Sequence, residues 1–207
     1  MSLGFNAILH AVIICVLVSV ITLFGLNGYN TKTKASFISI LFVLAVIFLL
    51  VFYVGKNASI QGFSAESLET IGGYSFDINY DMTNLFIGMY LICIIGTVID
   101  TSISVSSALN EVYENNKHLS KGELFKSGMN IGKDILATTI NTLYFATLSG
   151  FIGFFMWHYN TSFGYIINYK SFAQEIFKLL VCFIGSILII PITAFVTSLL
   201  LKKESEY

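Results

Sequence analysis

The sequence contains no arginine, and all eleven of its basic residues are lysine. The absence of guanidinium groups excludes the bidentate clamps with which proteins often hold phosphate or carboxylate groups. Charged residues make up only 11% of the chain, against about 25% in a soluble domain, whereas 56% of the residues are hydrophobic. The net charge of −1 gives no indication of a nucleic-acid partner. This composition is typical of an integral membrane protein whose surroundings are the lipid bilayer.

Cysteine and proline are also scarce. The three cysteines, Cys15, Cys93 and Cys182, lie in three different apolar runs without metal-ligand spacing, so we expect them to be packed inside the bundle. The one proline, Pro191, falls inside an apolar run, where membrane helices tolerate it. The sequence has no H-E-x-x-H, G-x-S-x-G or phosphate-binding glycine motif. We therefore expect no metal, no cofactor and no enzymatic activity.

Long hydrophobic runs dominate what is present. Five of them are long enough to cross a hydrocarbon core about 30 Å thick. They cover residues 5–26, 36–55, 84–108, 133–157 and 177–201. The predicted fold class is therefore all-α: a polytopic transmembrane helix bundle that forms a single domain over residues 1–207. The first run lacks a basic segment and a cleavage site of the signal-peptide type, so we interpret it as a membrane span.

The placement of lysine predicts the orientation of the bundle. Eight lysines fall in or beside the first and third loops and in the C-terminal tail, and three fall in the other loops. Because lysine-rich loops stay in the cytoplasm, we expect the N-terminus outside and the C-terminus inside. Residues 57–82 would then form an acidic extracytoplasmic loop. Residues 112–130 would form a cytoplasmic loop with a short amphipathic helix, which begins at a capping box of Ser120 and Glu123.

The third run contains a carboxylate, Asp100, although a charge inside a bilayer costs about 3 kcal/mol on insertion scales. Helical spacing places small and polar residues on the same face as Asp100, and the opposite face is expected to be Ile, Leu, Val and Phe. The residues that share its face are Cys93, Gly96, Thr97, Ser104, Ser107 and Glu111. The third span is therefore predicted to carry a polar seam.

The fourth run repeats this pattern with Asp134, Thr138, Asn141 and Ser149. Because a short loop joins the two runs, we expect their polar faces to meet, so that Thr138 and Asn141 form hydrogen bonds with Asp100. Small residues would allow the helices to approach closely, and these are Gly96, Ala108 and Gly150. Each polar residue also has a plainer interpretation. The hydroxyls are packing devices, Asp134 complements a helix dipole, and Asp100 is a hydrogen-bonded structural residue.

Residues 96–150 resemble the YibE/F-like family of multi-pass bacterial membrane proteins. The segments that carry the resemblance are GTVIDTSISVSSALNEV at 96–112 and KGELFKSGMNIGKDILATTINTLYFATLSG at 121–150, with GYNTKTKA at 28–35 and Gly62 upstream. Longer members carry an additional N-terminal membrane helix and an extracytoplasmic domain. The chain is similar to the stand-alone F-type half. The resemblance therefore implies an E-type membrane partner chain and a place in the bacterial cytoplasmic membrane.

A looser likeness concerns mechanism. The G-x-x-x-D pattern that ends at Asp100 is similar to that of RND-type transporters and SecDF, in which this aspartate takes part in proton translocation. The chain departs from them at Thr101, where many such pumps have a second aspartate, and it has no counterpart of their partner lysine. We expect a subunit of a transport or export complex with Asp100 as proton carrier. The alternative is a structural or assembly partner, or a homo-oligomer, whose polar seams serve helix packing.

Overall fold

The computed structural model describes residues 7–57 and 82–204, and every element in these ranges is helical. The elements are α1 (Ala7–Val20), which continues into the π-helical turn η1 (Ile21–Gly25), then α2 (Thr31–Asn57), α4 (Met82–Asn115), α5 (Lys121–Trp157), α6 (Phe163–Asn168) and α7 (Lys170–Glu204). Five of these helical segments are long and apolar enough to cross a membrane: α1 with η1, α2, α4, α5 and α7. The predicted all-α bundle with five spans is confirmed. The predicted extracytoplasmic loop lies outside the described residues.

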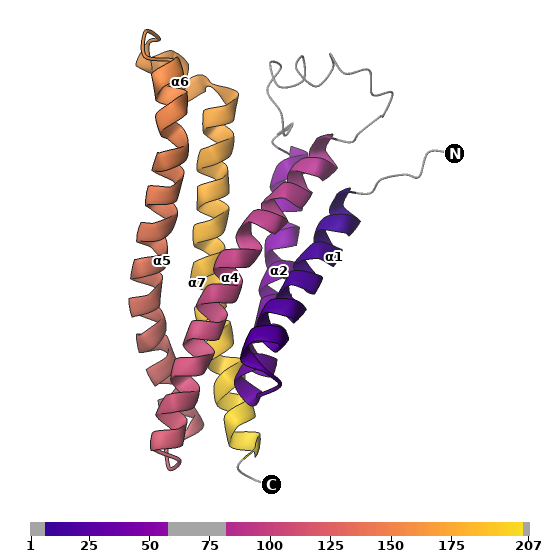
Figure 1. Cartoon of the computed structure of the whole chain (residues 1–207), viewed down its shortest axis with the longest axis vertical. Coiled ribbons are helices and arrows are strands. Elements are labelled where there is room, and N and C mark those ends of the chain that lie inside the picture. Colours follow the sequence, from indigo (N-terminus) through magenta and orange to yellow (C-terminus); the bar gives the residue numbers. More distant parts are fainter. Residues whose placement is uncertain (1–6, 58–81, 205–207) are drawn as a thin grey trace, which may run out of the picture.

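Helix α4 forms the centre of the bundle. It packs against α7, α2, α1 and α5, and α5 in turn packs mainly against α7. Figure 1 shows α4 crossing in front of α7, with α5 on one side and α1 on the other. Large side chains on the inner face of α4 are fully buried, among them Phe86, Ile94, Val98 and Leu109. Helices α5, α6 and α7 reach beyond the upper ends of the other helices (Figure 1).

The connection between α4 and α5 is shorter than predicted. Ser120 caps α5: its hydroxyl accepts a hydrogen bond from the Glu123 backbone N–H at 3.3 Å, and the Glu123 carboxylate accepts one from the Ser120 N–H at 2.8 Å. The predicted capping box is therefore confirmed, but the prediction of a separate short helix within 112–130 is wrong. The helix that starts at Lys121 continues to Trp157, because Gly128 and Gly132 pack against α7 and do not interrupt it.

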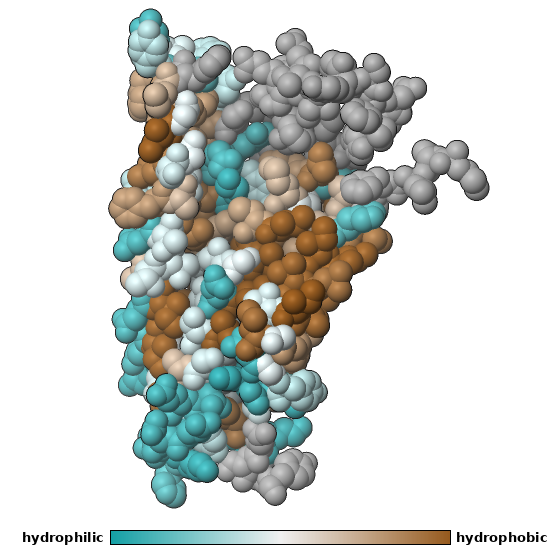
Figure 2. Space-filling model, viewed as in Figure 1, coloured by the Kyte–Doolittle hydropathy of each residue, from teal (hydrophilic) through white to brown (hydrophobic). Residues whose placement is uncertain are grey.

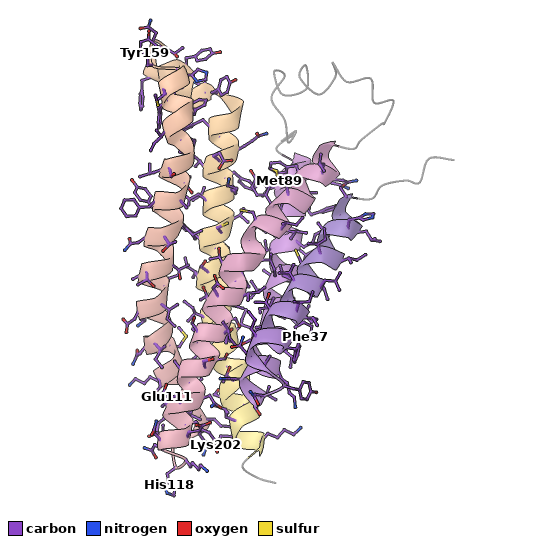
Figure 3. The ribbon with its side chains drawn as sticks, in the orientation of Figure 1. Phe37, Met89, Glu111, His118, Tyr159 and Lys202 are labelled. Carbon is purple, nitrogen blue, oxygen red and sulfur yellow. The ribbon has the colours of Figure 1, made fainter. Side chains whose placement is uncertain are left out.

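Figure 2, viewed as in Figure 1, shows that the lower end of the bundle is hydrophilic. The Lys202 ammonium donates a hydrogen bond to the Lys117 backbone carbonyl at 2.9 Å and lies 5.2 Å from the ring centroid of Tyr113. These contacts hold the end of α7 beside the turn between α4 and α5, near the labelled His118 in Figure 3. The lysine-rich loops thus share one end, which the positive-inside rule predicts to face the cytoplasm.

Much of the side surface of the bundle is apolar, as contact with lipid requires. Exposed side chains of α1 include Leu9, Ile13 and Leu17, and Ile21 of η1 is also exposed. Figure 2 shows a broad hydrophobic surface over α1, whereas hydrophilic side chains interrupt the surface over α4 and α5. Pro191 lies inside α7 without ending it, as the sequence predicts. The protein is therefore an integral membrane protein whose surface is unevenly polar.

Candidate functional site

The predicted polar seam of α4 lies on the outside of the bundle. We call it the α4 stripe, made of Gly96, Asp100, Ser104 and Glu111, which are exposed, and of Thr97 and Ser107, which are partly exposed. In Figure 3, Met89 and Glu111 mark the upper and lower ends of this face. Asp100 makes no hydrogen bond or ion pair with any described residue. It lies near the middle of α4, so a membrane around this chain alone would bring its carboxyl group close to acyl chains.

The polar residues of α5 also face outward. Asp134, Thr138 and Asn141 are all exposed. The Thr138 hydroxyl donates a hydrogen bond to the Ile135 carbonyl of its own helix at 2.8 Å, and the Thr142 hydroxyl donates to the Thr138 carbonyl at 3.0 Å. The expected hydrogen bonds from Thr138 and Asn141 to Asp100 are not formed, so that part of the prediction is wrong within one chain.

Glycine packing explains why α5 turns its polar face away. A Cβ added at Gly128 would lie 2.8 Å from the Ala194 Cβ, and one added at Gly132 would overlap the Ile190 side chain. The glycine face of α5 therefore contacts α7 directly. At 100° per residue, Asn141 lies about 180° around the helix from Gly132. Close packing of the glycines on α7 therefore directs Asn141 away from the bundle.

The glycines predicted to allow close approach do not do so within this chain. A Cβ added at Gly96 or at Gly150 would meet no atom within 4 Å, and Ala108 is partly exposed. The close contacts instead lie at Gly88, Gly128, Gly132 and Gly185, where an added Cβ would press on the side chain or backbone of a neighbouring helix. The small residues of the α4 stripe thus remain available to a helix from outside the chain.

A second polar feature lies inside the bundle, where the sequence predicted only apolar residues. The Ser36 hydroxyl of α2 forms a hydrogen bond of 2.6 Å with the Ser106 hydroxyl of α4, and the Ser102 hydroxyl bonds that of Thr193 in α7 at 2.9 Å. All four residues are buried. We call them the hydroxyl network. Ser102 and Ser106 are four residues apart and on the side of α4 opposite Asp100, a spacing that could have revealed them.

Other buried hydroxyls surround this network without a hydrogen-bond partner among the described residues. They belong to the same three helices and are those of Thr33, Thr101 and Thr197. A buried hydroxyl without a partner costs free energy, so these three hydroxyls do not help to hold the helices together. The interior between α2, α4 and α7 is therefore more polar than helix packing requires. Among the described residues, the buried polar side chains of these three helices are hydroxyls of serine and threonine and include no carboxylate or amine.

A cavity of about 420 Å³ opens between the upper halves of α4, α5 and α7. We call it the three-helix cavity. Aromatic side chains line it, including Phe151, Phe154 and Phe172. An ion pair between Glu175 and Lys178 also lies on its wall. The wall further includes Cys93 of α4 and Cys182 of α7. Nothing in the sequence indicates that these two cysteines share a cavity, because they lie in different apolar runs.

The described residues contain no cluster of three or more metal-ligating side chains that could hold a metal ion. Comparisons with curated proteins and with solved structures found no match. Among family models, the one described as YibE/F-like protein matches residues 1–203, nearly the whole chain of 207 residues. The resemblance noted in residues 96–150 is therefore confirmed, and the protein belongs to the YibE/F-like family.

Proposed function

We propose that the protein is a subunit of a transport or export complex in the bacterial cytoplasmic membrane, in which a partner chain covers the α4 stripe. The observation that carries this proposal is the position of Asp100. It is the nineteenth of the 34 residues of α4, and it is exposed without a partner among the described residues. A carboxylate left facing lipid at this depth costs about 3 kcal/mol on insertion scales. A polar group from a second chain would remove most of that cost.

The residues around Asp100 suit contact with another helix. Gly96, Asp100, Ser104 and Ala108 follow one another at intervals of four residues and therefore lie along one line of the helix surface. Small residues at this spacing let two membrane helices pack closely. The resemblance to the F-type half implies that the covering helix belongs to an E-type membrane chain. A second copy of this chain is the alternative occupant.

Within such an interface Asp100 is the candidate proton carrier. An intramembrane carboxyl group that faces a protein interface can bind and release protons as the interface opens and closes. Asp134 is exposed on α5, closer to the lysine-rich end of the bundle. In this mechanism it lies where protons would enter or leave the interface. Thr138 and Asn141 would then contact the partner chain, since they do not contact Asp100 in this chain.

Proton flux through the complex tests this proposal. The complex would be purified with its partner, reconstituted into vesicles that contain a pH-sensitive dye, and given a pH gradient. Asp100→Asn keeps the size of the side chain but cannot ionise, so we expect it to abolish the flux while a pull-down shows that the partner is still bound. Ser104→Ala, on the same stripe, serves as the matched control and should retain flux. Unchanged flux in Asp100→Asn would exclude the proton-carrier role.

The second candidate function is a structural or assembly partner, which the run of small residues on the α4 stripe favours. In that case Asp100 fixes the register of the contact and carries no protons. A bulky side chain on the α4 stripe should then disrupt the complex, so we expect Gly96→Leu not to retain the partner chain in the same pull-down. Retained flux in Asp100→Asn, together with loss of the partner in Gly96→Leu, would select this function over transport.

A further inference from the structure

We propose that Cys93 and Cys182 form a redox-active cysteine pair, which closes to a disulfide and locks α4 to α7 when a small disulfide oxidant enters the three-helix cavity. This inference does not depend on the proposed function. It rests on the position of two thiols from different helices, on the packing beside them and on the cavity that leads to them.

The two cysteines lie on neighbouring helices. Cys93 of α4 and Cys182 of α7 both line the three-helix cavity, and α4 and α7 pack against each other. Three residues after Cys182, Gly185 packs directly against the side chain of Ile94, which follows Cys93 in α4. The absence of a side chain at Gly185 lets the two helix backbones approach at the level of the thiols. A disulfide needs Cβ atoms about 3.5–4.5 Å apart and sulfur atoms about 2.05 Å apart. The close helix approach makes this reachable by rotation of the cysteine side chains.

The pair is also accessible. Cys93 is exposed and Cys182 is buried, and both line the three-helix cavity. The ion pair of Glu175 and Lys178 lies on the wall of the same cavity, and ionised groups retain water around them. A polar reagent can therefore approach the thiols. The predicted orientation places this upper half of the bundle toward the outside of the cell, where disulfides persist.

The reaction balances as two thiol–disulfide exchanges. The Cys93 thiolate attacks one sulfur of the oxidant, which releases one thiolate and leaves a mixed disulfide on Cys93. The Cys182 thiolate then attacks the Cys93 sulfur and releases the second thiolate of the oxidant. Two electrons pass from the protein to the oxidant, and the two protons lost by the cysteines go to the released thiolates. Cys93 reacts first because it is exposed, and Cys182 completes the bond.

Closure of the disulfide would restrict movement at the packing surface between α4 and α7. Asp100 lies seven residues after Cys93 on the same helix. Any shift of the α4 stripe relative to α7 would therefore be limited in the oxidised protein. Cys15 provides an internal comparison, because it is buried on α1 and makes no contact with another thiol among the described residues.

Thiol counting on the purified protein tests the inference. The protein would be treated with dipyridyl disulfide, denatured, and labelled with a maleimide polymer that shifts its mobility on a gel. The reduced protein has three free cysteines, and we expect one label after oxidation, on Cys15. Peptide mapping should find a Cys93–Cys182 link that a reducing agent removes. Three labels, or a link only between two chains, would overturn the inference.

Variants separate the pair from general thiol oxidation. Cys93→Ser and Cys182→Ser should each lose the link, whereas Cys15→Ser should retain it and show no label after oxidation. If oxidation changed the gel mobility of labelled Cys93→Ser in the same way as that of the unsubstituted protein, the inference would be overturned. Because peptide mapping of the unsubstituted protein identifies the linked residues directly, the result holds even if a serine variant fails to fold.

Discussion

The contact between Gly132 of α5 and Ile190 of α7 decides which face of α5 looks inward, and a single methyl group tests it. In Gly132→Ala the new Cβ would overlap the Ile190 side chain, and Ile190 is β-branched, so its methyl group cannot move away without a change of rotamer. Added volume in a packed interface typically destabilises by about 1–3 kcal/mol. Alanine also gains about 0.5–1 kcal/mol over glycine in the middle of a helix, which offsets part of this loss.

Gly96→Ala isolates the packing contribution. It gives the same gain in helix propensity, but its Cβ would meet no atom within 4 Å. The two variants should therefore differ by the overpacking energy alone, about 1–3 kcal/mol in the free energy of unfolding. Unfolding of the purified single chain by titration with sodium dodecyl sulfate in mixed micelles measures this difference. Equal stabilities for Gly132→Ala and Gly96→Ala would refute the orientation of α5 and with it the outward position of its polar residues.

Three further predictions follow from the same structure. Ser102→Ala leaves a buried hydroxyl partner without its hydrogen bond and should cost about 1 kcal/mol, whereas Ser104→Ala on the exposed face should change the stability little in the same unfolding assay. Ser120→Ala removes the cap of α5 and should cost about 1 kcal/mol, with faster amide hydrogen exchange confined to its first turn. In a cysteine-free background, a thiol at His118→Cys should react with an impermeant maleimide only after cells are opened, and one at Tyr159→Cys should react in intact cells; the reverse result would invert the predicted topology.

The sequence predicts those features of this bundle that depend on residues adjacent to one another in the chain. Five long apolar runs give five spans, and Ser120 with Glu123 gives a helix start, because both depend on residues close in sequence. The face that each helix turns toward the interior of the bundle cannot be predicted from neighbouring residues in this way. Lipid tails are as apolar as a protein interior, so an apolar face gains little by leaving the lipid, and polarity alone does not point a helix.

Particular residues show why the inward face of each helix could not be predicted from the sequence. Helix α4 carries hydroxyls on two opposite faces, with Ser102 inside and Ser104 outside, and the sequence does not rank them. Helix α5 carries Gly132 and Gly150 on the same face, but only Gly132 packs closely on α7, at Ile190, whereas Gly150 lines the three-helix cavity. The presence of Cys93 and Cys182 in one cavity depends on the pairing of two helices far apart in sequence.

Covering of the α4 stripe by another protein chain is the claim on which the proposed function depends. Photo-crosslinking in native membranes tests it most directly, with benzoylphenylalanine placed at Ser104 and, as a control, at Ile13 on the lipid-facing side of α1. We expect a protein adduct at Ser104, identified by mass spectrometry as an E-type chain or a second copy, and lipid adducts at Ile13. Lipid adducts alone at both positions would exclude a chain that covers the α4 stripe.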